Sequence, residues 1–177
     1  MAAAPEKRGV CFCRPCQSLI RAHAERMSST TIHLPNNPIT PIHVVTAAIV
    51  NHQDKRLFMQ RRSGTTRYPW YWGTPGGKVE TNEPKFMALC REMREEHGVV
   101  LRDEVLDVSR SVYRHEGPFG YVVRCYLIQH HLVIGAYRTA SKAVAGFDWV
   151  SAEELERLTP LAPADEANRE KLLALIR

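Results

Sequence analysis

GKVETNEPKFMALCREMREEHGV, residues 77–99, is the stretch around which this chain is organised. At about 100° per residue, a helix here places Glu95 and Glu96 within roughly 60° of Glu92, so three carboxylates share one face. Like charges at this spacing destabilise a helix and raise each other's pKa. The cluster therefore predicts a positively charged partner, and hard divalent cations such as Mg²⁺ prefer carboxylate oxygen.

The remaining faces of this helix complete its expected packing. The start is expected at Thr81 or Asn82, both good N-caps, and the end at Gly98, a typical C-cap. Arg91 and Arg94 are expected to point to solvent. An adjoining apolar arc is expected to pack inward: Phe86, Leu89, Cys90 and Met93.

Composition indicates one ordinary globular domain. The chain has 177 residues, 44% of them hydrophobic, which suits a single sizeable core. No apolar run approaches the roughly 20 residues that span a membrane, so no membrane partner is expected. The five cysteines do not imply disulfides, and Cys90 and Cys125 fall in predicted elements as small buried groups. A reducing, cytoplasmic location is the expectation.

The charge is unevenly distributed. Residues 43–82 hold six basic and two acidic residues, whereas residues 83–104 hold four basic and six acidic ones. Cations just before an acidic helix favour a phosphate-bearing ligand held against a metal site. There is no block of five or six basic residues, so a nucleic-acid partner is not indicated.

Residues 1–40 differ from the rest and are predicted to be a poorly ordered, Cys-rich extension of a domain at 41–177. One alternative is a targeting segment, because the extension is Arg-rich and nearly free of acidic residues. A second alternative is zinc binding. The domain pattern starts after Met27, which could be the true start. Four residues are candidate zinc ligands, although their spacing is not a usual one: Cys11, Cys13, Cys16 and His23.

Strand patterns flank the acidic helix. They are rich in β-branched and aromatic residues and cover 43–50, 56–60, 108–116, 119–129 and 146–150. Ser151 is expected to cap a short helix. A last helix is expected to start at Asp165 and to bury Leu172, Leu175 and Ile176. The order predicts an α/β fold with helices on both faces of a mixed sheet.

Between the second strand and the acidic helix lies a loop rich in glycine, proline and aromatic residues. Arg61 and Arg62 precede it, and only one of them can face a given site because strand neighbours alternate. The aromatic run at 70–72 could stack on a base, but at least two of its rings are expected in the core. Gly76 and Gly77 allow a bare carbonyl to approach a ligand.

Nine positions of the opening stretch match the Nudix pattern G-x5-E-x7-R-E-U-x-E-E-x-G-U, where U is bulky and aliphatic. They are Gly77, Glu83, Arg91, Glu92, Met93, Glu95, Glu96, Gly98 and Val99. The chain thus resembles the Nudix hydrolases. The resemblance implies an α/β/α sandwich with a mixed sheet over residues 41–177. It also implies hydrolysis of a nucleoside diphosphate linked to another group, with Mg²⁺ or Mn²⁺.

By the same resemblance, the box residues take specific roles. Glu83 and Arg91 would hold the loop and helix in register, and one of the box carboxylates would serve as base for the attacking water. The implied metal ligands are the Gly77 carbonyl, Glu92, Glu95 and Glu96.

Two further matches resemble MutT-type enzymes. In the segments QRR, 60–62, and GGK, 76–78, Arg62 and Lys78 would contact phosphate. The segment WVSAEELERLTPLAPADE, 149–166, resembles the C-terminal stretch of MutT and of the bacterial CTP pyrophosphohydrolase. Asp165 stands where MutT has a base-reading Asn, and a carboxylate only accepts hydrogen bonds. A preference for 8-oxoguanine is therefore not carried over, cytosine-type substrates stay open, and Asp165 could instead be a plain N-cap.

The expected function is Mg²⁺-dependent hydrolysis of nucleoside triphosphates, oxidised or modified ones included, to NMP and pyrophosphate in MutT-like sanitation of the nucleotide pool. Another Nudix substrate is the alternative: ADP-ribose, a sugar nucleotide, a dinucleoside polyphosphate or an RNA 5′ end. A catalytically dead Nudix binding module is a third reading, but the retained Glu92, Glu95 and Glu96 speak against it.

Overall fold

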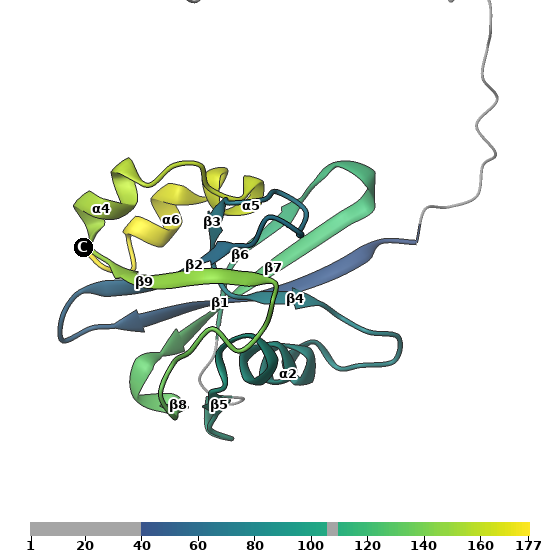
Figure 1. The fold of residues 1–177 in the computed structure, drawn as a ribbon, viewed down its shortest axis with the longest axis horizontal. Helices are drawn as coiled ribbons and strands as arrows, with labels where there is room; N and C mark the ends of the chain where they lie inside the picture. Colours follow the sequence, from purple (N-terminus) through teal and green to yellow (C-terminus); the bar gives the residue numbers. More distant parts are fainter. Residues whose placement is uncertain (1–39, 106–109) are drawn as a thin grey trace, which may run out of the picture. The chain divides into compact units, whose positions relative to one another are not determined.

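The computed structural model describes residues 40–105 and 110–177 (Figure 1). The extension, its candidate zinc ligands and the alternative start at Met27 lie outside the described residues. Within the described part of the chain, no helix combines the length and the apolar character needed to cross a membrane.

The elements follow the expected order of strands and helices. The strands are β1 (Ile42–Asn51), β2 (Arg56–Arg62), β3 (Trp72–Gly73), β4 (Gly76–Lys78), β5 (Val100–Leu101), β6 (Ser111–Glu116), β7 (Tyr121–Gln129), β8 (Val133–Ile134) and β9 (Val144–Val150). The α-helices are α2 (Lys85–His97), α4 (Ala152–Arg157), α5 (Pro163–Glu166) and α6 (Arg169–Leu173). Short 3₁₀ turns are η1 (Pro118–Gly120) and η2 (His130–Leu132).

The sheet is mixed, as predicted. Its main path runs β3-β2-β1-β7-β6, with β4 paired to β1 and β9 paired to β2. Strand β1 runs parallel to β7, whereas its pairings with β2 and β4 are antiparallel. The short strands β5 and β8 form a separate pair. Helix α2 lies on one side of the sheet and α4, α5 and α6 lie on the other (Figure 1), which confirms the predicted α/β/α layers.

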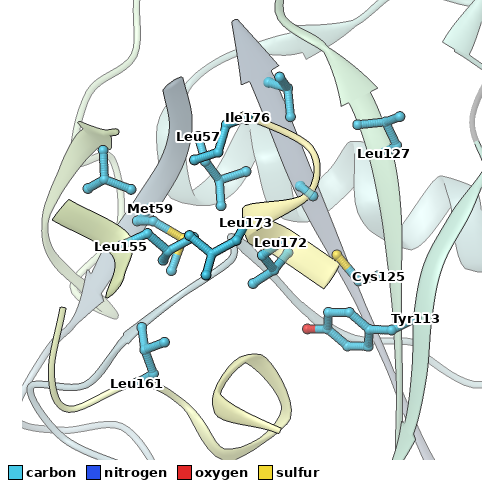
Figure 2. Close-up of a cluster of buried hydrophobic side chains, with 13 residues drawn as sticks. Leu57, Met59, Tyr113, Cys125, Leu127, Leu155, Leu161, Leu172, Leu173 and Ile176 are labelled. Carbon is cyan, nitrogen blue, oxygen red and sulfur yellow. The ribbon is translucent and has the colours of Figure 1, made fainter. Parts of the chain in front are cut away.

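Alternation along β1 and β2 divides the buried side chains between two core clusters. The cluster on the α2 side includes Val45, Ala47, Ile49, Phe58, Leu89 and Met93. The cluster beneath α4 and α6, shown in Figure 2, includes Ala48, Val50, Leu57, Met59, Leu155, Leu172 and Ile176. Helices thus pack on both faces of the sheet.

Helix α2 begins later than predicted. It starts at Lys85, and its N-cap is Pro84 with no side-chain cap, so the predicted start at Thr81 or Asn82 is wrong. Asn82 has a φ of 63° and instead forms the preceding turn. Gly98 ends the helix with a φ of 69°, which confirms the predicted C-cap.

The C-terminal segment also departs from expectation. It forms two short helices, capped at Ala162 and Asn168 rather than at Asp165. Asp165 lies inside α5 and is buried. Its carboxylate does not cap a helix, because it accepts hydrogen bonds from other segments. The predicted Ser151 cap is confirmed as a capping box with Glu154.

The aromatic run at 70–72 is mostly outside the core. Trp72 packs against the cluster beneath α4 and α6, but Trp70 is 52% exposed. Tyr71 is half-buried and contacts Tyr68 with ring centroids 5.7 Å apart. The prediction that at least two of these rings are core is therefore wrong, and the loop places them near the surface.

Candidate active site

Arg91, in the middle of α2, is the centre of an ion-pair network. Its Nε and Nη2 donate to the two oxygens of Glu83, both at 3.0 Å. Its Nη1 donates to Glu92 at 2.8 Å and to Glu95 at 3.3 Å, and Nη2 also reaches the Lys78 carbonyl at 2.9 Å. The expectation that Arg91 points to solvent is wrong, because the loop before the helix folds back and brings Glu83 to it. Arg94 is exposed, as predicted.

The three helix carboxylates differ in their surroundings. The Glu95 side chain is 58% exposed, whereas that of Glu92 is 14% exposed. Burial raises the pKa of Glu92, opposed by its hydrogen bond to Arg91. Burial also raises the pKa of Glu96 to about 7, and its Oε2 accepts from the Gly76 amide at 3.4 Å. A carboxyl with a pKa near neutrality is suited to proton transfer at cellular pH.

The glycine pair Gly76–Gly77, at the start of β4, lies directly against these carboxylates. Gly76 has a φ of 136°, a region that side chains other than hydrogen avoid. A Cβ on Gly77 would collide with the carboxylate of Glu92. The backbone can approach the helix this closely only because Gly77 has no side chain.

The donor set fits a hard divalent cation. Carboxylate oxygens from one helical face and a backbone carbonyl at a glycine cradle are the ligands that Mg²⁺ and Mn²⁺ favour. Over residues 40–105 and 110–177, however, no three Asp, Glu, His or Cys side chains converge closely enough to hold a metal as they stand. Arg91 bridges Glu92 and Glu95 in this arrangement, so it supplies the counter-charge that the sequence called for.

A cavity of about 330 Å³ adjoins the carboxylates through the same glycines. Arg62 and Lys78 line it beside Gly76 and Gly77, which places two cations next to the carboxylate-bearing helix. The same cavity extends to Asp165. Arg61 does not line it and lies instead over the Trp70 ring at 5.7 Å. The structure therefore selects Arg62 over Arg61 as the arginine that faces the site.

Asp165 is held rigidly in the cavity wall. Its Oδ2 accepts from the Thr74 amide at 3.0 Å. Its Oδ1 accepts from the Thr74 hydroxyl at 2.9 Å and from the Tyr113 hydroxyl at 2.7 Å. Burial raises the pKa of this carboxyl, and the three donors oppose that shift. Since a carboxylate offers about four acceptor positions, one on Oδ2 remains for a ligand that donates.

The floor of the cavity adds a second polar group. Thr46 lines it and is 8% exposed, and its hydroxyl has no hydrogen-bond partner among the described residues. Thr46 pairs with Cys125 in the β1–β7 register, and Tyr113 pairs with Cys125 from the other side. Figure 2 shows Tyr113 beside Cys125. The Cys125 thiol, a weak hydrogen-bonding group, interacts with this hydroxyl, so the hydroxyl is suited to meeting a ligand.

Aromatic side chains form the outer wall. The Arg67 guanidinium lies over the Tyr121 ring at 4.6 Å and over the Tyr68 ring at 5.4 Å, and all three line the cavity. Tyr68 has a φ of 58° and Trp70 one of 68°, conformations that cost free energy and cluster at functional sites. The loop is nevertheless fixed, because Arg62 Nε donates to the Arg67 carbonyl at 2.8 Å.

The sequence-predicted residues are thus gathered in two adjoining places. Gly77, Lys78, Arg62 and Asp165 line the cavity, while the box carboxylates stand behind its glycines. Sequence reasoning missed the other groups of the cavity wall: Thr46, Arg67, Tyr68, Thr74, Tyr113 and Tyr121. No local motif marks them, because tertiary pairing brings them together.

A carboxylate-bearing helix thus stands beside a cationic, partly aromatic cavity in an α/β/α sandwich. Residues 41–175 match the NUDIX domain. The chain belongs to the NUDIX family and is a Nudix hydrolase that acts on nucleotide derivatives.

Individual relatives support this assignment. The chain is 32% identical over 133 residues to the CTP pyrophosphohydrolase of Escherichia coli K12, which covers 74% of this chain and 91% of that protein. It is 30% identical over 141 residues to the m7GpppN-mRNA hydrolase NUDT17 of Danio rerio, covering 71% of this chain and 47% of that protein. Among solved structures, a MutT NUDIX hydrolase from Burkholderia pseudomallei superposes with a TM-score of 0.63 at 26% identity, covering 75% of this chain and 98% of that one.

Proposed function

We propose that the protein is a Mg²⁺- or Mn²⁺-dependent nucleoside triphosphate pyrophosphohydrolase that releases NMP and pyrophosphate. The observation that supports it most is the single cavity running from the Arg62 and Lys78 cations to the buried Asp165 carboxylate. Its volume of about 330 Å³ is at the lower end of small-molecule sites and suits one nucleoside with part of its phosphate chain.

In this proposal the helix end of the site holds and cleaves the phosphate chain. Glu92, Glu95, Glu96 and the Gly77 carbonyl would hold the cation. When bound, the cation would neutralise phosphate charge and lower the pKa of the attacking water. Glu96, a carboxylate at the cation, would take the proton from that water. Glu83 supports the part of the site formed by α2 through its ion pair with Arg91.

The cations in the cavity would position the phosphate chain. Arg62 and Lys78 present their charges at the wall next to the glycine turn. An arginine can bind phosphate in a bidentate manner, whereas a lysine acts as a point charge. Hydrolysis would then break the bond between the α- and β-phosphates and release NMP and pyrophosphate.

The far end of the cavity would read the base. Asp165 can accept one more hydrogen bond, so it favours a base with an amino group at that edge, as in cytosine. The Tyr68 and Tyr121 rings offer apolar surfaces for stacking. Several bases carry such an amino group, and the similarity to a CTP pyrophosphohydrolase makes a cytosine nucleotide the substrate that we propose. Removal of modified nucleotides from the cellular pool is the role that we propose.

A capped or triphosphorylated RNA 5′ end is the second candidate, because one relative is an mRNA hydrolase. The test is a panel of nucleoside triphosphates, ADP-ribose, a dinucleoside polyphosphate and a 5′-triphosphorylated RNA, each with Mg²⁺ and with EDTA. We expect NMP and pyrophosphate from a triphosphate, with Mg²⁺ only. Preferential cleavage of the RNA or of ADP-ribose would overturn the proposal.

An Arg62→Ala variant links the panel to the site. We expect it to raise KM for the triphosphate by about tenfold, since a charge-assisted hydrogen bond is worth about 1.5–3 kcal/mol. The matched control is Arg61→Ala, which removes the neighbouring arginine that does not line the cavity. Equal effects of the two substitutions would count against the assigned phosphate path.

A further inference from the structure

Two buried polar side chains connect the core to Glu96. Gln60, on β2, is 2% exposed and also lines the cavity. His97, at the end of α2 and next to Glu96 in the chain, is fully buried. Gln60 Oε1 and His97 Nε2 lie 2.5 Å apart, a short hydrogen bond. Both residues belong to the α2 side of the sheet, where the box carboxylates are found.

The surroundings of His97 determine which way this hydrogen bond runs. Its ring is packed among aromatic side chains, with the Phe58 ring edge-on at 5.0 Å and the Phe147 ring at 5.9 Å. His97 Nδ1 has no hydrogen-bond partner among the described residues. The Arg138 backbone interacts with the His97 ring, but no described acceptor meets hydrogen-bond geometry with Nδ1, so a proton on Nδ1 would be poorly satisfied. A proton on Nε2 is satisfied, because the Gln60 carbonyl oxygen accepts it.

This choice also fixes the Gln60 amide. With Oε1 turned to His97, the amide NH₂ points the other way. The Gln60 side chain hydrogen-bonds Glu96 there, and a carboxylate can only accept. The reverse amide orientation would place a carbonyl oxygen against the carboxylate and leave the histidine donor unpaired. With Glu96 ionised, this amide orientation satisfies all three residues, whereas the reverse orientation leaves the carboxylate facing a carbonyl oxygen.

We propose that Gln60 is a positioning residue for Glu96, and that His97 locks its amide so that the NH₂ group holds the carboxylate in the orientation that binds the cation. The inference rests on the proposed function, in which Glu96 is a metal ligand. Partners behind a metal ligand typically change metal affinity or activity by about 10–100-fold when they are lost. Glu96 then has two fixed donors, the Gln60 amide and the Gly76 backbone N–H, and its remaining lone pairs face the site.

The test is binding of Mn²⁺ alone to the full chain, measured by the electron paramagnetic resonance signal of the free ion. His97→Phe keeps a ring in the aromatic cluster but removes the donor, and Gln60→Leu removes the amide. We expect each to weaken Mn²⁺ binding by about tenfold and to lower kcat more than it raises KM. His97→Gln returns an N–H donor at a similar reach, so it should regain affinity relative to His97→Phe.

The matched control is Tyr137→Phe. Tyr137 packs on Phe58 with ring centroids 4.5 Å apart, and its buried hydroxyl has no partner among the described residues. This substitution disturbs the same cluster without touching the proposed chain of hydrogen bonds, so Mn²⁺ affinity should not change. If His97→Phe fails to fold, Gln60→Leu carries the test alone.

Wild-type Mn²⁺ affinity in folded His97→Phe and Gln60→Leu would overturn the inference. Glu96→Gln separates this failure from that of the proposed function. If Glu96→Gln weakens Mn²⁺ binding while the other two variants do not, the metal site stands and only the positioning role falls. If Glu96→Gln also binds Mn²⁺ normally, Glu96 is not a ligand and both proposals fall.

Discussion

At the helix end of the site, the three carboxylates come from five consecutive positions of α2, residues 92–96. At the other end of the cavity, Asp165 meets Thr74 from 91 residues away and Tyr113 from 52 residues away. The first arrangement is set by helical geometry alone, whereas the second exists only once β6, α5 and the segment between β3 and β4 have come together. We therefore expect the α2 carboxylates to determine which bond is broken. We expect the surroundings of Asp165, at the far end of the cavity, to determine which nucleotide is bound.

The largest effect is expected at the helix end. Glu96→Gln removes the charge and the proton acceptor of the proposed metal site. We expect kcat to fall on the order of 10³-fold, because a metal site contributes several kcal/mol to transition-state stabilisation. Steady-state kinetics with saturating Mg²⁺ measures this, and circular dichroism checks the fold. A loss of less than tenfold would mean that another residue carries this role.

Gly77→Ala tests how closely the turn must approach the helix. The added Cβ would displace the Glu92 carboxylate, and we expect metal affinity and kcat each to fall by about 10–100-fold. Titration with Mn²⁺ at constant substrate measures the change. The control is Gly146→Ala on β9, where a Cβ would meet nothing within 4 Å. Similar losses in both variants would show a general effect on the sheet rather than on the site.

The pH dependence of metal binding tests the same part of the site, the carboxylates of α2. In the metal-free protein, Glu96 has a pKa of about 7, so below that pH a cation must displace its proton. We expect Mn²⁺ affinity to fall by about tenfold for each pH unit below 7 and to level off above it. Calorimetric titrations between pH 5.5 and 8.5 would show this, and the slope should be shallower in Glu96→Gln. A flat wild-type profile would contradict the raised pKa.

The smallest effect is expected at the far end, from Tyr113→Phe. This change removes one of three donors to the buried Asp165 carboxylate. We expect a loss of about 1–3 kcal/mol in the free energy of unfolding, with little change in Mn²⁺ affinity. Urea denaturation measures the stability. A matched control is Tyr126→Phe on the same pair of strands, which removes a hydroxyl that does not reach Asp165. Equal losses would argue against this hydrogen bond.

The same contrast explains what could be predicted from the sequence. Spacing alone placed Glu92, Glu95 and Glu96 on one face, and Gly98 ended the helix as expected. The orientation of Arg91 was wrong because a helical projection omits the loop that returns Glu83 to it. The N-cap was misplaced for the same reason, since Asn82 belongs to that loop.

At the far end, local sequence carried less information. Asp165 could be chosen only by resemblance, and its competing reading as a helix cap proved wrong because Thr74 and Tyr113 hold its carboxylate. Tyr68 and Tyr121 meet through Arg67, and no periodicity records that contact. At least two rings of the aromatic run were expected in the core, whereas a loop with a positive φ at Trp70 holds that ring outward.

The most direct test of this division is the ratio of kcat/KM for CTP to that for UTP, which differ by an amino group or a carbonyl at one edge of the base. It is measured in the wild type, in Glu96→Gln and in Asp165→Asn. The account predicts that Glu96→Gln lowers both values and leaves the ratio unchanged, while Asp165→Asn lowers the CTP value by about tenfold more than the UTP value. A ratio that shifts in Glu96→Gln, or that stays constant in Asp165→Asn, would contradict it.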